Sequence, residues 1–179
     1  MSHAAVPIAG AILLGRRRLS LPVIGIGLVF AMLPDIDVIG FPLGVDYADT
    51  WGHRGATHSL LFAAASALFM VALLRPRHYI IASVYLFIAM ASHGLLDMLT
   101  NGGLGAAILW PWNDQRYFAP ITPIAVSPLG ISNFISQRGA RVLLSEIIWI
   151  WVPISVLVGA ILGLKKWRLR WLRQNGTAQ

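Results

Sequence analysis

A short motif in this sequence, SHGLLD, carries an imidazole and a carboxylate at a spacing that suits metal binding. His93 and Asp97 lie four residues apart, so on a helix both side chains project from the same face. The pair could hold one metal ion, or it could form a hydrogen bond that helps helices pack. Because ionisable groups are costly inside apolar segments, their presence there favours a functional role.

A second motif, MLPDIDV, places two carboxylates directly after an apolar segment. Pro34 is expected to end a helix, so Asp35 and Asp37 would follow in a turn, two residues apart. Carboxylates at this spacing could bridge or flank a hard cation, and either one could act as a general base. The alternative interpretation is a solvated turn at a helix end.

A third motif, GHRGATHS, gathers two imidazoles and a guanidinium at the start of an apolar run. His53 and His58 flank a turn, and Thr57 is expected to cap the helix that follows. Imidazole nitrogens bind zinc and similar divalent ions, while the planar fork of Arg54 suits a phosphate or carboxylate group. The alternative is a polar cap at the membrane interface, which two histidines and an arginine in eight residues make the weaker interpretation.

The composition of the chain restricts both its class and its metal ligands. Of its 179 residues, 57% are hydrophobic and 12% are charged, and the mean hydropathy is +0.71. This excess of apolar residues indicates a membrane protein rather than an ordinary soluble domain. Cysteine is absent, so a metal would be held by histidine, aspartate or glutamate side chains.

Apolar stretches separated by polar segments predict an all-α fold. We expect a polytopic membrane helical bundle with about five apolar helices, forming one domain over residues 1–179 with a basic tail at 166–179. A bilayer core needs about 20 helical residues. The last two stretches are that long, whereas the first two would form a short helical hairpin. The five stretches are Ala4–Leu14, Leu19–Leu33, His58–Leu74, Tyr79–Thr100 and Val142–Leu164.

Basic residues predict how this bundle is oriented in the membrane. Threading the chain as five helices puts ten of them on one face, which the positive-inside rule makes cytoplasmic. The N-terminus would then lie outside and the C-terminus in the cytoplasm, and all seven acidic residues fall towards the outer face. The lipid bilayer is the expected partner, and no nucleic acid is, because no separate basic module exists. The ten are Arg16, Arg17, Arg18, Arg75, Arg77, Lys165, Lys166, Arg168, Arg170 and Arg173.

Helical rise places several polar groups at one depth. His3, Asp35, His58, His93 and Glu146 each lie 13 to 19 residues from a basic cluster along their own segment. If these segments are helical, the five groups lie roughly 20–28 Å above the cytoplasmic boundary. Residues far apart in sequence would therefore share one layer towards the outer face. Glu146 could be a ligand, but a structural role as a helix-end charge or a partner of an arginine ranks first.

The region from about Asn101 to Arg141 is rich in glycine, proline and tryptophan and is expected to be irregular. Its segment LWPWNDQRYFAP carries Trp110 and Trp112, which would anchor the chain at the interface. Arg116 in the same segment could contact a substrate anion.

Taken together, these motifs resemble a known family. SHAAVP, MLPDIDV, HRGATHSLL, SHGLLDMLTNGG and LWPWNDQRYFAP occur in this order and resemble the YdjM family of bacterial inner-membrane proteins, particularly its YbcI-type members. The resemblance covers the chain from His3 to about Lys166. It implies an inner-membrane location and a metal-dependent hydrolase activity.

The resemblance extends to a more distant class of enzymes. The YdjM family is considered similar to zinc-dependent phospholipase C and P1-type nucleases, helical enzymes whose zinc ions are held by histidine and aspartate. This implies that the fold resembles their helical core and that one or two zinc ions, or another divalent metal, are bound here. No histidine follows His93, so the late HxxxE pair of those enzymes has no counterpart. The implied metal ligands are His3, Asp35, Asp37, His53, His58, His93 and Asp97.

Two hypotheses about function follow. In the first, the chain is a membrane-bound hydrolase whose metal-activated water attacks a phosphoester, such as a phospholipid or a lipid-linked phosphoester, near the periplasmic face. Asp35 or Asp37 would then be the base, and Arg54 would steady the developing negative charge. In the second, the same ligands form a structural or transport-related metal or lipid site with no catalysis. Seven candidate ligands exceed what one structural zinc needs, which favours the enzyme.

Overall fold

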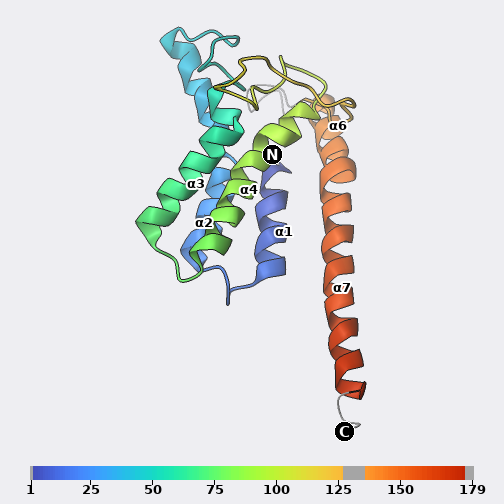
Figure 1. The fold of residues 1–179 in the computed structure, drawn as a ribbon. Helices are drawn as coiled ribbons and strands as arrows, with labels where there is room; N and C mark the ends of the chain where they lie inside the picture. The colour runs from blue at the N-terminus through green and yellow to red at the C-terminus, as the bar shows by residue number, and fades with distance from the viewer. Residues whose placement is uncertain (1, 127–135, 176–179) are drawn as a thin grey trace.

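The computed structural model describes residues 2–126 and 136–175, and its regular elements within those ranges are all helical (Figure 1). No β-strand occurs in the described part, so the all-α prediction is confirmed there. The α-helices are joined by four helical elements of other types. These are the 3-10 helices η1 (Ser2–Ala4), η2 (Leu33–Leu43) and η3 (Ala56–His58), and the π-helical η4 (Ile147–Trp151). The α-helices are α1 (Ala5–Leu14), α2 (Leu21–Phe30), α3 (Leu60–Leu74), α4 (Tyr79–Met98), α6 (Gln137–Glu146) and α7 (Val152–Asn175).

Among the described residues, two helices are long and apolar enough to cross a membrane. They are α4 and the continuous helix of 38 residues from Gln137 to Gln174. A third candidate span is the pair α2 and η2, which is bent by 43° between its two parts. The remaining apolar helices, Ser2–Leu14 and Leu60–Leu74, are shorter than a span requires. The structure therefore supports a helical membrane bundle with two or three candidate spans, and the prediction of about five apolar helices is not confirmed beyond that.

Small residues allow the core helices to approach closely. On α3, Ala63 and Ala67 lie one turn apart and are buried in the cluster that also contains Leu86 and Met90 of α4. On α2, Gly27 lies against the ring of Tyr85, and a β-carbon at that glycine would collide with the ring. This packing fixes α4 between α2 and α3, and α4 is the element that carries the SHGLLD motif.

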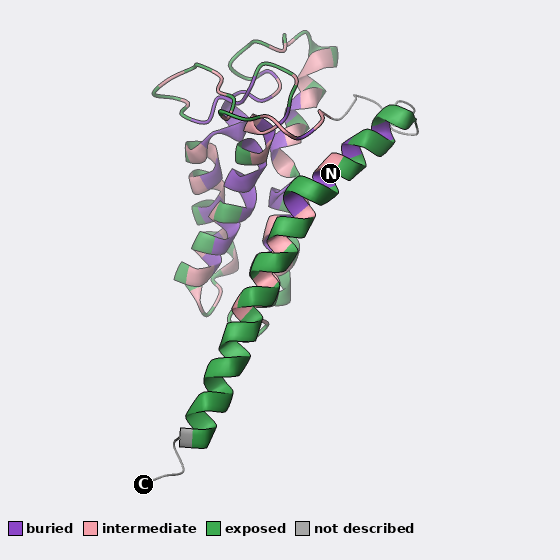
Figure 2. Cartoon of the chain, turned by 90° about the vertical axis from the view of Figure 1, so that its right-hand side faces the viewer, coloured by how far each residue is buried: buried purple, intermediate pink, exposed green. Residues whose placement is uncertain are grey.

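The last helix lies at the edge of the bundle. In its most apolar stretch only 11% of residues are buried, against 50% for α4, and Figure 2 shows α7 exposed over most of its surface. It contacts α1, where Lys165 donates a hydrogen bond of 3.1 Å to the carbonyl of Leu13. An apolar helix this exposed is suited to contact with lipid.

The two ends of the bundle differ in composition. The loops at 15–20 and 75–78, which carry five arginines, lie at the same end as the C-terminal part of α7 (Figure 1). The opposite end carries η2, η3 and the irregular segment that follows α4. This separation of basic loops from the three motifs agrees with the charge pattern of the sequence.

Three local predictions differ from the structure. Pro34 does not end the helix that precedes it: α2 ends at Phe30, and Pro34 lies in the first turn of η2, which also carries Asp35 and Asp37. These two aspartates therefore lie on a 3-10 helix and not in a turn. The irregular region ends earlier than Arg141, because α6 begins at Gln137. Residues 127–135 of that predicted region lie outside the described residues.

Candidate metal centre

Four side chains from three separate elements converge at the end of the bundle opposite the basic loops. Asp35 comes from η2, His58 from η3, and His93 and Asp97 from α4, and one ligand atom of each lies within 4.8 Å of the others. The Nε2 atom of His93 is 3.2 Å from Oδ1 of Asp35 and 3.6 Å from Oδ2 of Asp97. The Nε2 atom of His58 is 3.7 Å and 3.2 Å from the same two oxygens.

These separations fit one metal ion. Tetrahedral zinc with ligand bonds of about 2.0–2.2 Å has neighbouring ligand atoms roughly 3.3–3.6 Å apart. The four separations between imidazole nitrogens and carboxylate oxygens, 3.2 to 3.7 Å, fall on or beside that range. Two imidazoles and two carboxylates form a donor set that suits zinc and other divalent transition metals.

The same atoms lack hydrogen-bond partners within the described part of the chain. Nε2 of His58, Nε2 of His93 and Oδ2 of Asp97 are buried and make no hydrogen bond, although Oδ2 has Nε of Arg54 and Nε2 of His58 as ion-pair neighbours at 3.2 Å each. A buried polar atom without a partner costs about 1–3 kcal/mol. Three such atoms facing one another are therefore an observation that a bound cation would explain.

Outer contacts fix which nitrogen of each histidine faces the cluster. Nδ1 of His93 lies 2.7 Å from the backbone carbonyl of Ala31, an acceptor, so Nδ1 carries the proton and Nε2 presents a lone pair. Nδ1 of His58 lies 3.2 Å from Oδ2 of Asp37. Both arrangements are typical of metal-binding histidines, whose second nitrogen donates to a carbonyl or carboxylate.

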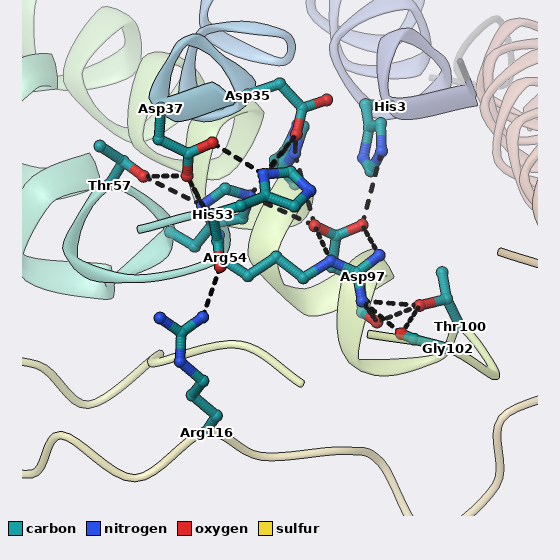
Figure 3. A network of polar contacts seen from close by, with 12 residues as sticks. His3, Asp35, Asp37, His53, Arg54, Thr57, Asp97, Thr100, Gly102 and Arg116 are labelled. Carbon is teal, nitrogen blue, oxygen red and sulfur yellow. Dashed lines mark hydrogen bonds and ion pairs between the residues drawn. The ribbon is translucent and has the colours of Figure 1, made fainter. Parts of the chain in front are cut away.

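Asp37 is the carboxylate that organises the η2–η3 region (Figure 3). It accepts hydrogen bonds from the hydroxyl of Thr57 at 2.8 Å and the backbone N–H of Arg54 at 3.1 Å, and its Oδ1 is 2.7 Å from Nδ1 of His53. Asp37, His53 and His58 form a second group with metal-ligand spacing. Because the oxygens of Asp37 already have these partners, its contacts favour a role in orienting His53 and His58.

Arg54 binds Asp97 and the loop that follows α4. Its Nη2 donates to Oδ1 of Asp97 at 3.2 Å, and its Nε lies 3.2 Å from Oδ2 of the same carboxylate. Its Nη1 donates to Thr100 Oγ1 at 3.0 Å and to the Gly102 carbonyl at 2.9 Å. The side chain is buried and both of its terminal nitrogens donate hydrogen bonds within the protein, which favours a positioning role over the predicted contact with a substrate.

His3 lies beside the cluster and outside the four-atom group. Its ring stacks on that of His93 with 3.8 Å between ring centroids, and its Nε2 is 3.8 Å from Oδ1 of Asp97. Its Nδ1 is buried without a hydrogen-bond partner. The structure thus brings the N-terminus to the same layer as the other predicted ligands.

The carboxylates around His58 favour a positive charge at this position, either a proton or a metal ion. Burial alone lowers the pKa of this imidazole, but hydrogen bonding to the carboxylates of Asp35, Asp37 and Asp97 outweighs that effect and raises its pKa to about 10. Three carboxylates therefore create a negative site that a proton or a metal ion can occupy. A metal ion would displace the proton from His58.

Two other predicted candidates have structural contacts. Glu146 is buried and accepts a hydrogen bond of 2.8 Å from the hydroxyl of Ser2, a contact that joins α6 to the N-terminus. Arg116 donates to the backbone carbonyls of Tyr47, Asp49 and His53 and so holds the loop before η3 in place.

Several positioning residues were not found from the sequence. Thr57 does not cap α3: the hydroxyl of Ser59 accepts from the N–H of Phe62, and Thr57 donates to Asp37 instead. Gly94 lies against the backbone of His58, where a β-carbon would come within 2.5 Å of the carbonyl oxygen. A glycine directly after a candidate ligand was the one sequence signal of this close approach.

The fold and the cluster define a class: a helical membrane protein with a buried group of histidine and aspartate side chains that could hold a metal ion. Residues 1–169 match the family described as YdjM inner membrane protein, and the chain therefore belongs to that family. It is 40% identical over 164 residues to the inner membrane protein YbcI of Escherichia coli strain K12, which covers 90% of this chain and 95% of the relative. No solved structure matches the chain.

Proposed function

We propose that this chain is a membrane-bound, metal-dependent hydrolase that acts on a phosphoester. The observation that carries the proposal is the contrast in burial within the cluster. His58 and His93 are fully buried and Asp97 is 6% exposed, while 43% of the Asp35 side chain is exposed. Three buried ligands beside a fourth that solvent reaches would let water replace Asp35 in the fourth coordination position, which catalytic zinc sites require and closed structural sites do not offer.

The residues divide into three proposed roles. His58, His93 and Asp97 would hold one zinc ion or another divalent metal, with Asp35 as the fourth ligand or the base beside it. Arg54 and Asp37 would orient these ligands, and His3 and His53 lie at the positions expected of additional ligands to a second ion. The proposed relation to zinc-dependent phospholipase C and P1-type nucleases rests on the HxxxD spacing of His93 and Asp97 alone.

Bound zinc supplies a Lewis acid that lowers the pKa of water towards 7. Asp35 can accept the proton of that water, because its carboxylate faces the cluster on one side and solvent on the other. In the hydrolysis that this site would support, Asp35 would hold the proton of the attacking water and pass it to the departing alcohol when the ester P–O bond is replaced by a bond from phosphorus to the water oxygen. The Arg54 guanidinium, with Nε 3.2 Å from Oδ2 of Asp97, would hold this carboxylate in place beside the metal.

The proposed location follows from the charge pattern. The chain belongs to an inner-membrane family, and its basic loops lie at the end of the bundle opposite the cluster. By the positive-inside rule the cluster would then face the periplasm, with the C-terminus in the cytoplasm. A site at that level would be accessible to phospholipids or lipid-linked phosphoesters of the outer leaflet.

The test is metal content and phosphoester hydrolysis of detergent-purified protein. We expect near-stoichiometric metal in the unchanged chain, and loss of both metal and hydrolysis in His93→Ala. The matched control is His78→Ala, which removes the histidine at the basic end of the bundle and should leave both unchanged. Hydrolysis that survives His93→Ala would refute the mechanism. A stoichiometric metal without turnover of phosphoesters or phospholipids would favour the structural or transport-related alternative.

A further inference from the structure

A second feature, an apolar groove between α1 and α4, has no role in the metal centre. Its volume is about 280 Å³, and its walls include Pro7 and Gly10 of α1 and Val84, Ile88 and Ala89 of α4. Tyr85 is the one residue lining the groove whose side chain carries a polar atom. Its hydroxyl donates a hydrogen bond of 3.2 Å to the backbone carbonyl of Pro7. The groove therefore offers no free hydrogen-bonding group and suits a hydrocarbon.

The groove is in register with the histidine layer on both of its walls. On α4, Tyr85, Ala89 and His93 are spaced four residues apart and so lie on one face of the helix. On the other wall, Pro7 of α1 follows His3 of η1 by the same four residues. His3 and His93 stack on each other with 3.8 Å between ring centroids. Both walls thus lead, one helical turn further, to the stacked imidazoles.

The dimensions of the groove argue against a helix as its occupant. From Ile80 to Ala89 the wall formed by α4 runs nine residues, roughly 14 Å. A helix about 10 Å across over that length would need roughly 1,000 Å³, more than the empty space of about 640 Å³ in the groove, open solvent included. A single extended hydrocarbon chain is thinner, and the surrounding bilayer supplies such chains at high concentration.

We propose that the α1–α4 groove binds one acyl chain of a phospholipid whose phosphoester head lies at the His–Asp cluster. The identity of the head rests on the proposed function, whereas the binding of the chain does not. In this arrangement the chain follows α4 through the hydrocarbon layer, and its polar end emerges at the level of His3 and His93. The groove would select lipids over water-soluble phosphoesters by the apolar area that the chain removes from water.

The test is photo-crosslinking in vesicles of phosphatidylethanolamine and phosphatidylglycerol that contain a phospholipid with a diazirine in its acyl chain. Labelling is mapped on the α1 peptide, which the variants leave unchanged. Val84→Trp and Ile88→Trp fill the groove from partly exposed positions, 52% and 47%, so neither disturbs the core. We expect each to reduce α1 labelling several-fold. The matched control is Leu68→Trp on α3, 62% exposed and away from the groove, which should leave it unchanged.

Labelling of α1 that is unchanged by both groove variants, or reduced equally by Leu68→Trp, would overturn the proposal. A free fatty acid with the same diazirine is the second arm, and equal labelling by it would contradict a head group held at the cluster. Crosslinking requires no turnover, so the two proposals fail separately. Labelling without any hydrolysis would support acyl-chain binding in the groove and refute the hydrolase activity. Lipid hydrolysis that is insensitive to Val84→Trp would support the hydrolase activity and contradict acyl-chain binding in the groove.

Discussion

The guanidinium of Arg54 and the carboxylate of Asp97 form a two-point contact, with Nη2 3.2 Å from Oδ1 and Nε 3.2 Å from Oδ2. Both groups are buried, and the same oxygen Oδ2 faces the Nε2 atoms of His58 and His93. Asp97 thus lies between a fixed cation and the proposed metal. The contact sets the direction in which this carboxylate presents its remaining lone pairs.

Arg54→Lys is therefore expected to weaken metal binding while keeping the charge. Lysine has no planar fork, so it cannot hold both oxygens of Asp97. Loss of such an outer contact typically lowers metal affinity 10- to 100-fold. Arg54 has a left-handed backbone conformation with φ of 65°. Arginine and lysine are equally strained in this conformation, so the substitution does not change the free-energy cost of the backbone.

The measurement for Arg54→Lys is zinc affinity by competition with a chromophoric chelator. Arg77→Lys, at the basic end of the bundle, is the control and should bind zinc as the unchanged chain does. An affinity for zinc in Arg54→Lys equal to that of the unchanged chain would show that the fork does not position Asp97.

Removing the metal should lower the melting temperature. A ligand that binds only the folded state, at 1,000 times its dissociation constant, stabilises it by about 4 kcal/mol. Here the effect has a structural reason, since chelation leaves three buried atoms without partners. Thermal unfolding in detergent, with excess zinc and with a chelator, measures the difference. His93→Ala should show no difference between the two conditions, and a metal-independent melting temperature in the unchanged chain would contradict a bound ion.

Gly94→Ala should destabilise the cluster more than an ordinary glycine substitution in a helix. The new methyl would come within 2.5 Å of the carbonyl oxygen of His58, so η3 would have to move away from α4. Overpacking of this kind costs about 1–3 kcal/mol and should also weaken zinc binding. The control is Gly159→Ala in α7, where nothing lies within 4 Å and alanine favours the helix by about 1 kcal/mol. Unchanged stability and zinc affinity in Gly94→Ala would mean that η3 is not held against α4.

The sequence predicted the cluster well where the signal was local and periodic. The four-residue spacing of His93 and Asp97 and the common depth of Asp35 and His58 depend only on helix geometry, and the structure brings those four residues together. It could not distinguish ligands from the residues that orient them, because Asp35 and Asp37 differ by two positions and only tertiary contacts separate them. Thr57, Asp37 and the carbonyl of Ala31 act through long-range hydrogen bonds that no pattern records.

The extent of the helices was harder to predict than their existence. Apolar composition alone does not show that α2 ends at Phe30 or that the 3-10 helix η2 begins at Leu33. Both elements pack against α4, and such tertiary contacts are not visible in the composition. In the same way, Thr57 and Ser59, two residues apart, are equally suited to capping α3 by residue type. The structure selects Ser59 because Asp37 accepts the hydroxyl of Thr57.

The orientation of the bundle can be tested because the chain contains no cysteine. Ala48→Cys places a thiol in the exposed loop at the cluster end, and Ser20→Cys places one at the basic end, where the serine side chain makes no cap hydrogen bond. If the positive-inside rule holds, a membrane-impermeant maleimide applied to cells with a permeabilised outer membrane should label Ala48→Cys and not Ser20→Cys. After lysis of the inner membrane both should react, which controls for accessibility. Labelling of Ser20→Cys alone in intact inner membranes would place the cluster in the cytoplasm and exclude a periplasmic substrate.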